Sequence, residues 1–383
     1  MPIVLVSRRV KKDLLILCLQ CVIISSAASV SLFKAGQLGV FEYRIPVLLS
    51  VPPHNDTLLA FAEARLSCTR SCGDRSFWGD SAAKHIAFRR STDAGKSWSP
   101  INFIVKSNGT NDNLNLGSAV WDSQAQKVLL HWGGCVHCGC QGTVPKPKKC
   151  DNPSSASAWQ LESPDLGATW NSAVDIGDQI LTTKSPIWKF GEGSGVQLSD
   201  GTLVVCGRSS SSSIHGIENQ GSACMHSTNN GQTWYVGAHG LGGNHGANEC
   251  DLALLSNGSI LLNMRAHAAR FIARSDDGGR TFDNVTRAAS LDPVADCQGS
   301  MIALADGSGE LVFSGPHNSK HSRSNLSLAL SSDDGGTWRY VKTVDTGVSE
   351  YSSLAAIAGR QVGILYEVDG YSSINFTTVT LPS

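Results

Sequence analysis

One eight-residue pattern, Ser-x-Asp/Asn-x-Gly-x-x-Trp/Phe, occurs five times in this chain of 383 residues and constrains its fold more than any other feature. The Asp or Asn side chain can bond nearby backbone N–H groups, and glycine can adopt a positive φ, so each copy predicts a tight turn. The aromatic residue closes that turn against a sheet. Strand-like segments such as Lys84–Phe88 and Asn325–Leu330 precede the copies, which indicates a hairpin within a repeating sheet unit. The copies are Ser91–Trp98, Ser163–Trp170, Ser227–Trp234, Ser275–Phe282 and Ser331–Trp338.

The spacing of the copies predicts the number of units. They begin 72, 64, 48 and 56 residues apart, a mean of about 60, and a domain of about 355 residues would hold about six such units. Strand repeats of this period are typical of a β-propeller, in which four-stranded sheets surround an axis. We therefore predict an all-β fold, a six-bladed β-propeller. Because its blades must close in a ring, residues 29–383 are expected to form a single domain.

The first residues resemble a secretory leader. Basic residues between Arg8 and Lys12 precede an apolar run from Leu14 to Ile24 and small residues from Ser25 to Ser29. This order is typical of a signal peptide, and we expect residues 1–28 to be cleaved. An uncleaved signal anchor is the alternative, but a run of 11 apolar residues is short for a membrane span of about 20. The predicted compartment is the secretory pathway, with a lysosomal or extracellular destination.

Composition excludes some partners and supports that compartment. A net charge of −1 with 16% charged residues gives no electrostatic footprint for nucleic acid and no polybasic membrane patch. Ten cysteines follow the leader, an even number that suggests disulfides in a secreted protein. Asn-x-Ser/Thr sequons agree with this route and lie at Asn55, Asn108, Asn257, Asn284, Asn325 and Asn375.

One group of cysteines and a histidine has the short spacing of zinc ligands. The alternative is a disulfide-held insertion, which we prefer because the leader implies an oxidising route. No metal or cofactor is therefore expected. The group comprises Cys135, His137, Cys138, Cys140 and Cys150.

The repeated turns resemble the Asp-boxes of the sialidase superfamily, a folding signature that also occurs in non-catalytic propellers and in other glycosidases. Other segments carry a more specific resemblance. Phe41–Pro46 is similar to the Phe/Tyr-Arg-Ile-Pro motif near the start of sialidases, and Leu58–Arg65 to the segment that follows it. The resemblance runs from Phe41 to Glu367 and is closest to animal lysosomal-type sialidases, on segments that include Gly193–Gln197 and Tyr351–Leu354.

The resemblance implies a role for each matching residue. Arg44, Arg265 and Arg323 correspond to a triad that holds the substrate carboxylate, and Arg65 lines the pocket. Tyr351 matches the catalytic tyrosine and Glu249 its partner base. The late glutamate Glu367 would hold Arg44 in place.

The acid/base aspartate of the family lies on a loop that corresponds here to Leu66–Ala83. This loop looks expanded and offers both Asp74 and Asp80. We favour Asp80, because it stands four residues before Lys84, in the Asp-x-x-x-Lys frame of lysosomal-type relatives. A second departure is Gly191-Glu-Gly-Ser194, which replaces the Gly-Pro-Gly of many relatives.

The chemistry of sialic acid explains why these residue types are needed together. Guanidinium groups meet its carboxylate with bidentate, charge-assisted hydrogen bonds. A carboxylate nucleophile would be repelled, by about 4 kcal/mol at 4 Å and an effective dielectric of 20. A neutral tyrosine avoids this cost, and sialidases are known for a tyrosine nucleophile. Since the tyrosine pKa is near 10, it needs a base such as Glu249.

The resemblance therefore implies an exo-α-sialidase, a glycoside hydrolase that removes terminal sialic acid with retention of configuration. Its partners would be sialylated glycoproteins, glycolipids or oligosaccharides, with no nucleic acid and no stable membrane insertion after signal cleavage. A trans-sialidase shares all of these residues. A propeller lectin that binds sialic acid needs the arginines but not Tyr351, Glu249 or the aspartate.

Overall fold

The computed structural model describes residues 29–52, 56–66, 83–107, 114–135, 156–181, 187–210, 220–320 and 322–382. The all-β prediction is confirmed. Strands joined by turns make up the described chain, and its helical segments are the single turn α1 (Gly177–Ile180) and the short 3-10 turns η1 (Gln37–Gly39), η6 (Gly243–His245) and η7 (Ala289–Leu291). No helix in the described ranges has the length and apolar character that a membrane crossing requires.

Antiparallel strands form three sheets of four strands each. The first contains β2 (Glu42–Val51), β3 (Thr57–Arg65), β4 (Lys84–Ser91) and β5 (Asn102–Val105). The second contains β6 (Asn115–Asp122), β7 (Lys127–Cys135), β8 (Ala156–Ser163) and β9 (Val174–Asp175). The third contains β15 (Cys250–Leu254), β16 (Ile260–Ala266), β17 (Ala269–Ser275) and β18 (Thr286–Arg287).

Two larger sheets complete the fold. The five-stranded sheet contains β10 (Ile187–Phe190), β12 (Leu203–Ser210), β13 (Gln220–Ser227), β14 (Tyr235–Val236) and, beside β12, β11 (Val196–Gln197). The seven-stranded sheet runs in the order β1 (Val30–Lys34), β24 (Ser373–Thr380), β23 (Gln361–Val368), β22 (Arg339–Ala358), β21 (Ser324–Ser331), β20 (Leu311–Pro316) and β19 (Ser300–Ala303).

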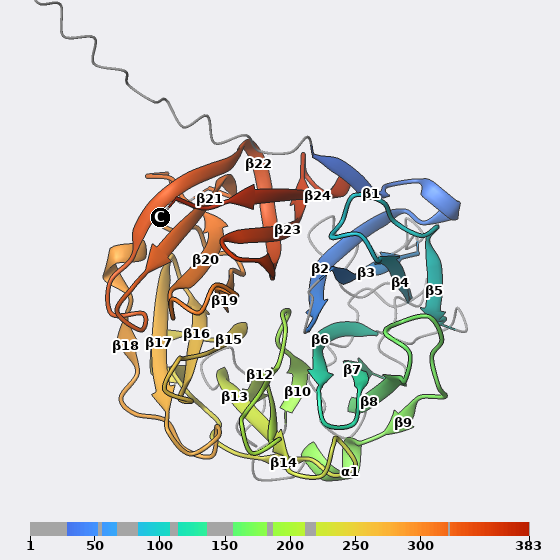
Figure 1. Cartoon of the computed structure of the whole chain (residues 1–383), viewed down its shortest axis with the longest axis horizontal. Helices are drawn as coiled ribbons and strands as arrows, with labels where there is room; N and C mark the ends of the chain where they lie inside the picture. The colour runs from blue at the N-terminus through green and yellow to red at the C-terminus, as the bar shows by residue number, and fades with distance from the viewer. Residues whose placement is uncertain are drawn as a thin grey trace, which may run out of the picture.

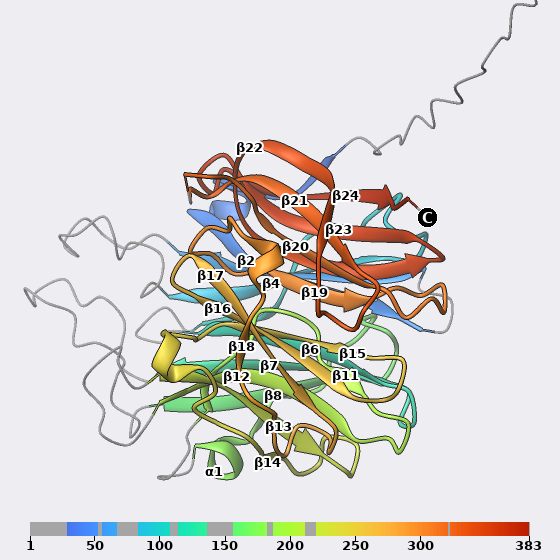
Figure 2. The same ribbon diagram turned by 90° about the vertical axis from the view of Figure 1, so that its left-hand side faces the viewer.

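We expected six separate blades, but the strands of the described chain pair into five sheets. The physical reason is the 20-residue strand β22. Its first half pairs with β21 and its second half with β23, so two groups of strands share one continuous hydrogen-bonded sheet. Figures 1 and 2 show the sheets following one another around the molecule in chain order, from blue through green to red.

The repeated turns are confirmed as hairpin turns. Each of the five copies connects the strand at which it begins to the next strand along the chain, with which that strand pairs, as Ser331–Trp338 connects β21 to β22. In that copy Asp333 accepts hydrogen bonds from the backbone N–H of Thr337 at 2.8 Å and from its hydroxyl at 2.7 Å. The motif is therefore a self-contained turn whose polar groups bond one another, as its sequence predicts.

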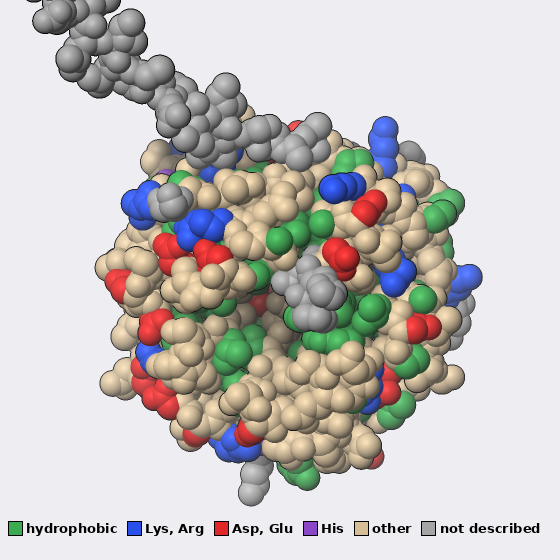
Figure 3. All heavy atoms as spheres, viewed as in Figure 1, with side chains coloured by type: hydrophobic (Ala, Val, Ile, Leu, Met, Phe, Trp, Pro, Cys, Tyr) green, Lys and Arg blue, Asp and Glu red, His purple; other side chains and the backbone are tan. Residues whose placement is uncertain are grey.

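Apolar side chains fill the spaces between neighbouring sheets. Val47, Phe61 and Phe88 of the first sheet pack with Leu130 and Trp132 of the second. On the face shown in Figure 3, hydrophobic side chains gather around a hollowed centre, and charged side chains lie mainly toward the outer edge. The charged residues of the candidate site lie instead near the ends of particular strands.

One disulfide is present among the described cysteines. Cys206 of β12 is bonded to Cys250 of β15, with 6.2 Å between their Cα atoms, in agreement with the expected disulfides. Cys224 and Cys297 are buried free thiols. Cys138, Cys140, Cys150 and His137 of the proposed insertion, like the predicted signal peptide, lie outside the described residues.

Candidate active site

A cavity of about 610 Å³ contains most of the residues that the sequence predicted. The predicted residues that line it are Arg44, Arg65, Glu249, Arg265, Arg323 and Tyr351. Glu367 does not line the cavity but contacts Arg44 from behind. Asp80 and its alternative Asp74 lie outside the described residues, so the acid/base assignment stays a prediction.

The ends of strands place these side chains in the wall of the cavity. Arg44 lies near the start of β2 and Arg65 at the end of β3. Because the two strands are antiparallel, these positions meet, and Glu42 is paired directly with Arg65. Glu249 stands immediately before β15, and Arg265 lies near the end of its partner strand β16. The same hairpin geometry therefore delivers two functional side chains from each sheet.

Arg44 is fixed by a fully buried carboxylate. Its Nε and Nη2 atoms donate to the two oxygens of Glu367 at 2.9 and 3.1 Å, a bidentate pair. Glu367 also accepts the backbone N–H groups of Ile45 at 2.8 Å and Tyr351 at 3.1 Å. The Arg44 guanidinium lies 3.9 Å from the ring centroid of Tyr371. The predicted role of Glu367 as the group that holds Arg44 agrees with this geometry.

The three predicted triad arginines converge. Nη2 of Arg265 and Nη2 of Arg323 both donate to the backbone carbonyl of Asp296, at 3.1 and 3.0 Å. The guanidinium carbons of Arg44 and Arg323 lie 5.1 and 5.7 Å from the ring centroid of Tyr351. Three guanidinium groups around one tyrosine form a cationic site suited to a carboxylate.

Tyr351 and Glu249 form the centre of the site. The Tyr351 hydroxyl donates to Oε1 of Glu249 and accepts from Nη1 of Arg265 at 3.0 Å. Burial and the negative charge of Glu249 raise the pKa of Tyr351 well above its ordinary value, so the hydroxyl is neutral. Burial disfavours the charged form of Glu249, but Arg208 and Arg265 outweigh it and hold the pKa of Glu249 below its ordinary value. A charged acceptor thus faces a neutral phenol.

Arg65 belongs to a separate charged cluster in the cavity wall. It forms ion pairs with Glu63 at 2.9 Å and Glu42 at 3.3 Å. Glu63 also pairs with Lys84 at 3.3 Å and accepts the backbone N–H of Leu116 at 3.1 Å. This cluster links the first sheet to the second at the cavity, and in it Arg65 pairs with carboxylates of its own sheet.

Several residues in or next to the cavity were not predicted as site residues. Arg208 contacts both Glu192 and Glu249, Tyr371 stacks on Arg44, and Asp296 pairs with Arg265 at 2.8 Å. The only sequence feature that pointed to one of them was Glu192, which stands where many relatives have the proline of Gly-Pro-Gly. The others follow no motif, because tertiary contacts alone bring them to the site.

The charge of the cavity favours an anionic ligand. Among the described residues that line it, six side chains are cationic and four are carboxylates. No group of three or more described His, Cys, Asp or Glu residues could hold a metal ion. The arrangement offers carboxylate binding beside a buried Tyr–Glu pair, the combination expected of a glycosidase for acidic sugars.

Comparison with known proteins gives the family. Residues 143–364 match the family model described as a BNR repeat-like domain. A sialidase of Bacteroides fragilis (strain YCH46) is 26% identical over 357 residues, covering 87% of this chain and 61% of that protein. A sialidase of Micromonospora viridifaciens is 29% identical over 347 residues, covering 87% of this chain and 50% of that protein. The chain thus spans between half and two thirds of the length of these curated relatives.

Solved structures show the same fold. The Hadza microbial sialidase Hz136 superimposes with a TM-score of 0.74 at 24% identity, over 92% of this chain and 68% of the other. A Trypanosoma rangeli sialidase, solved as a covalent intermediate with 2,3-difluorosialic acid, gives a TM-score of 0.70 at 19% identity, over 92% and 58%. Fold and site define a sialidase-type β protein. The chain belongs to the BNR-repeat family within the sialidase superfamily.

Proposed function

We propose that this protein is an exo-α-sialidase that hydrolyses terminal sialic acid by a retaining, two-step mechanism. The observation that carries the proposal is the hydrogen bond from Tyr351 to Glu249, at a point where Arg265 also contacts Tyr351. A lectin would need the arginines alone. Similarity to named sialidases supports the same activity.

In the first step Arg44, Arg265 and Arg323 bind the substrate carboxylate. The Tyr351 oxygen bonds to the anomeric carbon as the glycosidic C–O bond breaks, and the phenolic proton passes to Glu249. Asp80, our predicted acid, protonates the leaving oxygen. The covalent intermediate of the Trypanosoma rangeli enzyme supports carrying this chemistry over by analogy.

In the second step water attacks the anomeric carbon while Asp80 accepts its proton. The bond to Tyr351 breaks, and Glu249 returns the proton to the phenolate. The raised pKa of Tyr351, caused by burial and by Glu249, makes free phenolate unfavourable. Glu249 must therefore act during attack rather than before it.

We also infer that the scaffold is a closed six-bladed propeller. A Cβ atom on each repeat glycine would meet a side chain of another strand group: Gly167 faces Phe88, Gly231 faces Leu129, Gly279 faces Val204 and Gly335 faces Leu261. In each case that group is the preceding one. The first copy continues the series, because Gly95 faces Phe376 of β24. Counting the two halves of β22 separately gives six groups, which supports a ring closed between the first and the last.

The compartment and substrates extend this proposal. The leader-like N-terminus supports entry into the secretory pathway, with action on sialylated glycoproteins, glycolipids or oligosaccharides in lysosomes or outside the cell. Closeness to the animal lysosomal type remains part of this proposal.

The test is hydrolysis of a fluorogenic α-sialoside by the purified protein, followed by NMR of the sugar first released. Release of the α-anomer supports a retaining hydrolase, whereas the β-anomer as first product contradicts it. Transfer to an added sugar acceptor would indicate a trans-sialidase. Binding of sialosides without turnover would indicate a lectin and overturn the proposal.

A further inference from the structure

Glu192 is a carboxylate in the cavity wall that the proposed reaction does not use. Only 6% of its surface is exposed. Oε1 accepts a hydrogen bond from Nη2 of Arg208 at 3.1 Å, and Oε2 is buried without a partner among the described residues. Its segment is the one in which the sequence departs from the Gly-Pro-Gly of many sialidases. A buried charge at such a position needs a physical explanation.

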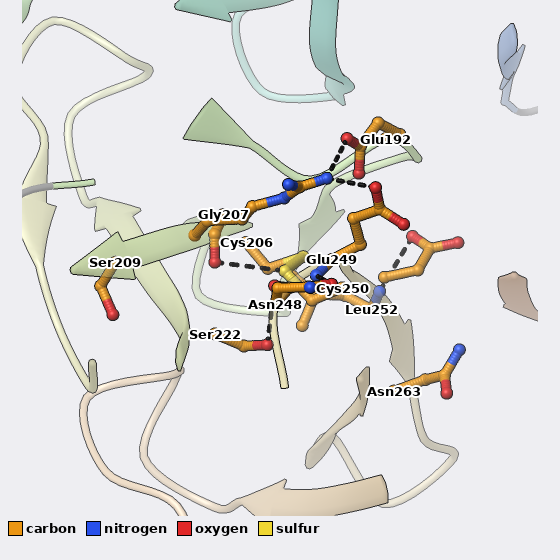
Figure 4. Close-up of a disulfide and its surroundings, with 12 residues drawn as sticks. Glu192, Cys206, Gly207, Ser209, Ser222, Asn248, Glu249, Cys250, Leu252 and Asn263 are labelled. Atoms are coloured by element: carbon orange, nitrogen blue, oxygen red, sulfur yellow. Dashed lines mark hydrogen bonds and ion pairs between the residues drawn. A yellow bond between two sulfur atoms is a disulfide. The ribbon is translucent and has the colours of Figure 1, made fainter. Parts of the chain in front are cut away.

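Arg208 connects Glu192 to the Tyr–Glu pair. The same Nη2 atom contacts Oε1 of Glu249, the oxygen that accepts the hydrogen bond of Tyr351. Figure 4 shows Glu192 and Glu249 at the same end of one guanidinium group, with dashed lines from both carboxylates to one of its nitrogen atoms. A cation at this oxygen stabilises the carboxylate form and opposes transfer of the phenolic proton to it. A negative charge on Glu192 offsets that effect.

The disulfide holds this arrangement in place. Cys206 stands two residues before Arg208 on β12, and Cys250 directly follows Glu249, so the bond joins the two strands that carry the pair. Gly191 packs directly on this bond, because a Cβ atom there would crowd the sulfur atoms of both cysteines. Glu192 is thus held against the covalently joined strands.

We propose that Glu192 is a positioning residue that sets, through Arg208, how readily Glu249 accepts the proton of Tyr351. This inference rests on the proposed function. When Glu192 is ionised, it shares the positive charge of Arg208, and Glu249 is the stronger base. When Glu192 is protonated, Arg208 acts on Glu249 alone, and the tyrosine is less activated.

The pKa of Glu192 lies near neutral pH, so its charge can change within the pH range of an activity assay. Burial, together with the charge of Glu249, raises the pKa of Glu192 to about 7, while Arg208 and Lys189 oppose the shift. Asp251 of β15 lies against the neighbouring Gly193, and burial raises its pKa to about 7 as well. The charged and titratable groups that face Glu192 or its segment are Lys189 on β10, Arg208 on β12, Glu249 before β15, Asp251 on β15 and Tyr351 on β22.

The decisive measurement is kcat against pH for wild type and Glu192→Gln on 4-methylumbelliferyl α-sialoside. Its phenolic leaving group needs little protonation, so loss of the acid catalyst at high pH does not hide the effect. We expect equal kcat at pH 5, where Glu192 is protonated in the wild type. At pH 8 the variant should be roughly tenfold slower, the effect of about one pKa unit on a catalytic group.

Two further variants separate this role from a structural one. Asp251→Asn removes the other carboxyl that titrates near pH 7 but bonds Ser300 and Met301 instead of Arg208, and it should keep the wild-type pH profile. Glu192→Gln combined with Arg208→Gln removes both charges, so kcat at pH 8 should recover toward the wild-type value. Unchanged affinity for 2,3-didehydro-2-deoxy-N-acetylneuraminic acid would show that each variant is folded with Arg44, Arg265 and Arg323 in place.

Failure of this inference can be told apart from failure of the proposed function. A wild-type protein that cleaves sialosides, with a Glu192→Gln variant of identical pH profile, overturns the inference alone. A profile that Asp251→Asn flattens equally, or a double variant no faster than Glu192→Gln, also overturns it. A wild-type protein without sialoside cleavage overturns both proposals.

Discussion

Tyr351 and Glu367 are joined through the backbone, because the N–H of Tyr351 donates to Oε2 of Glu367 at 3.1 Å. The same carboxylate holds Arg44 by two hydrogen bonds. One buried group therefore fixes the strand position of the proposed nucleophile and the orientation of one substrate-binding arginine. A displacement of Glu367 would therefore move both Tyr351 and Arg44.

Glu367→Gln is expected to lower both stability and substrate binding. An amide offers one acceptor oxygen where the carboxylate serves four donors, and Arg44 would lose its buried counter-charge. Breaking a buried ion pair costs about 3–5 kcal/mol, measurable by urea denaturation, and KM should rise. The control is Glu162→Gln, which breaks the partly exposed pair with Lys127 and should cost less than about 1 kcal/mol. Equal losses in the two variants would contradict this account.

Tyr351→Phe should abolish turnover while leaving the fold intact. The substitution removes only the hydroxyl that bonds Glu249 and Arg265, so kcat should fall by at least about a thousandfold, since loss of the nucleophile costs about a millionfold in a serine protease. Stability should change by only about 1 kcal/mol. The measurements are single-turnover kinetics, thermal denaturation and affinity for the didehydro sialic acid inhibitor. A variant that keeps wild-type turnover would show that another residue attacks.

The methyl ester of the sialoside tests the arginine triad. Each charge-assisted hydrogen bond contributes about 1.5–3 kcal/mol, so loss of the carboxylate charge should lower kcat/KM by at least about a hundredfold. In Arg323→Gln the preference for the acid over the ester should shrink. Arg287→Gln, which removes an exposed arginine paired with Asp292, should leave that preference unchanged. The same preference in Arg323→Gln as in wild type would remove Arg323 from the substrate-binding site.

The free energy of unfolding should be greater at pH 5 than at pH 7.5. Burial raises the pKa of Glu192, Asp251 and Glu350 to about 7, so the folded protein keeps protons that the unfolded chain releases near pH 4. Their contribution is present at low pH and is lost as pH rises toward 7, by about 1.4 kcal/mol per unit of pKa difference. Glu249, whose pKa is held low against its burial by Arg208 and Arg265, acts oppositely and loses its contribution below about pH 4.

Thermal denaturation across this pH range checks the prediction. Glu350→Gln should flatten the decline, because Oε2 of Glu350 is buried without a partner among the described residues. A transition temperature that rises steadily from pH 5 to 7.5 would show that these carboxyls are ionised in the folded protein.

The sequence could predict those features of the molecule that depend on residues close together in the chain. The turn at Ser331–Trp338 bonds mainly within itself, so its residues are sufficient to indicate it. Arg44, Tyr351 and Glu249 stand in recognisable frames for a similar reason. Tyr371 does not, because it reaches Arg44 through a turn with a φ of 72° that no motif marks. The continuity of β22 through two groups of strands likewise depends on pairing that the repeat spacing does not contain.

The contact between the first repeat and the last strand gives a stability test of the proposed ring. Gly95, in the turn between β4 and β5, has a φ of 84°, and a Cβ atom there would overlap the ring of Phe376 in β24. Gly36 has a similar φ of 82° but open space around its Cα. Alanine at either position costs about 1–2 kcal/mol for the left-handed backbone, and Gly95→Ala should lose about 1–3 kcal/mol more from overpacking.

Urea denaturation of the two alanine variants separates these contributions, since the backbone cost is common to both. The additional loss in Gly95→Ala should disappear when Phe376 is also shortened to leucine, because the ring atoms that meet the new Cβ are then absent. A double-mutant cycle measures this coupling directly. Equal losses in Gly95→Ala and Gly36→Ala would mean that the first turn does not pack on β24 in solution, and the proposed closure between the first and last strand groups would then be wrong.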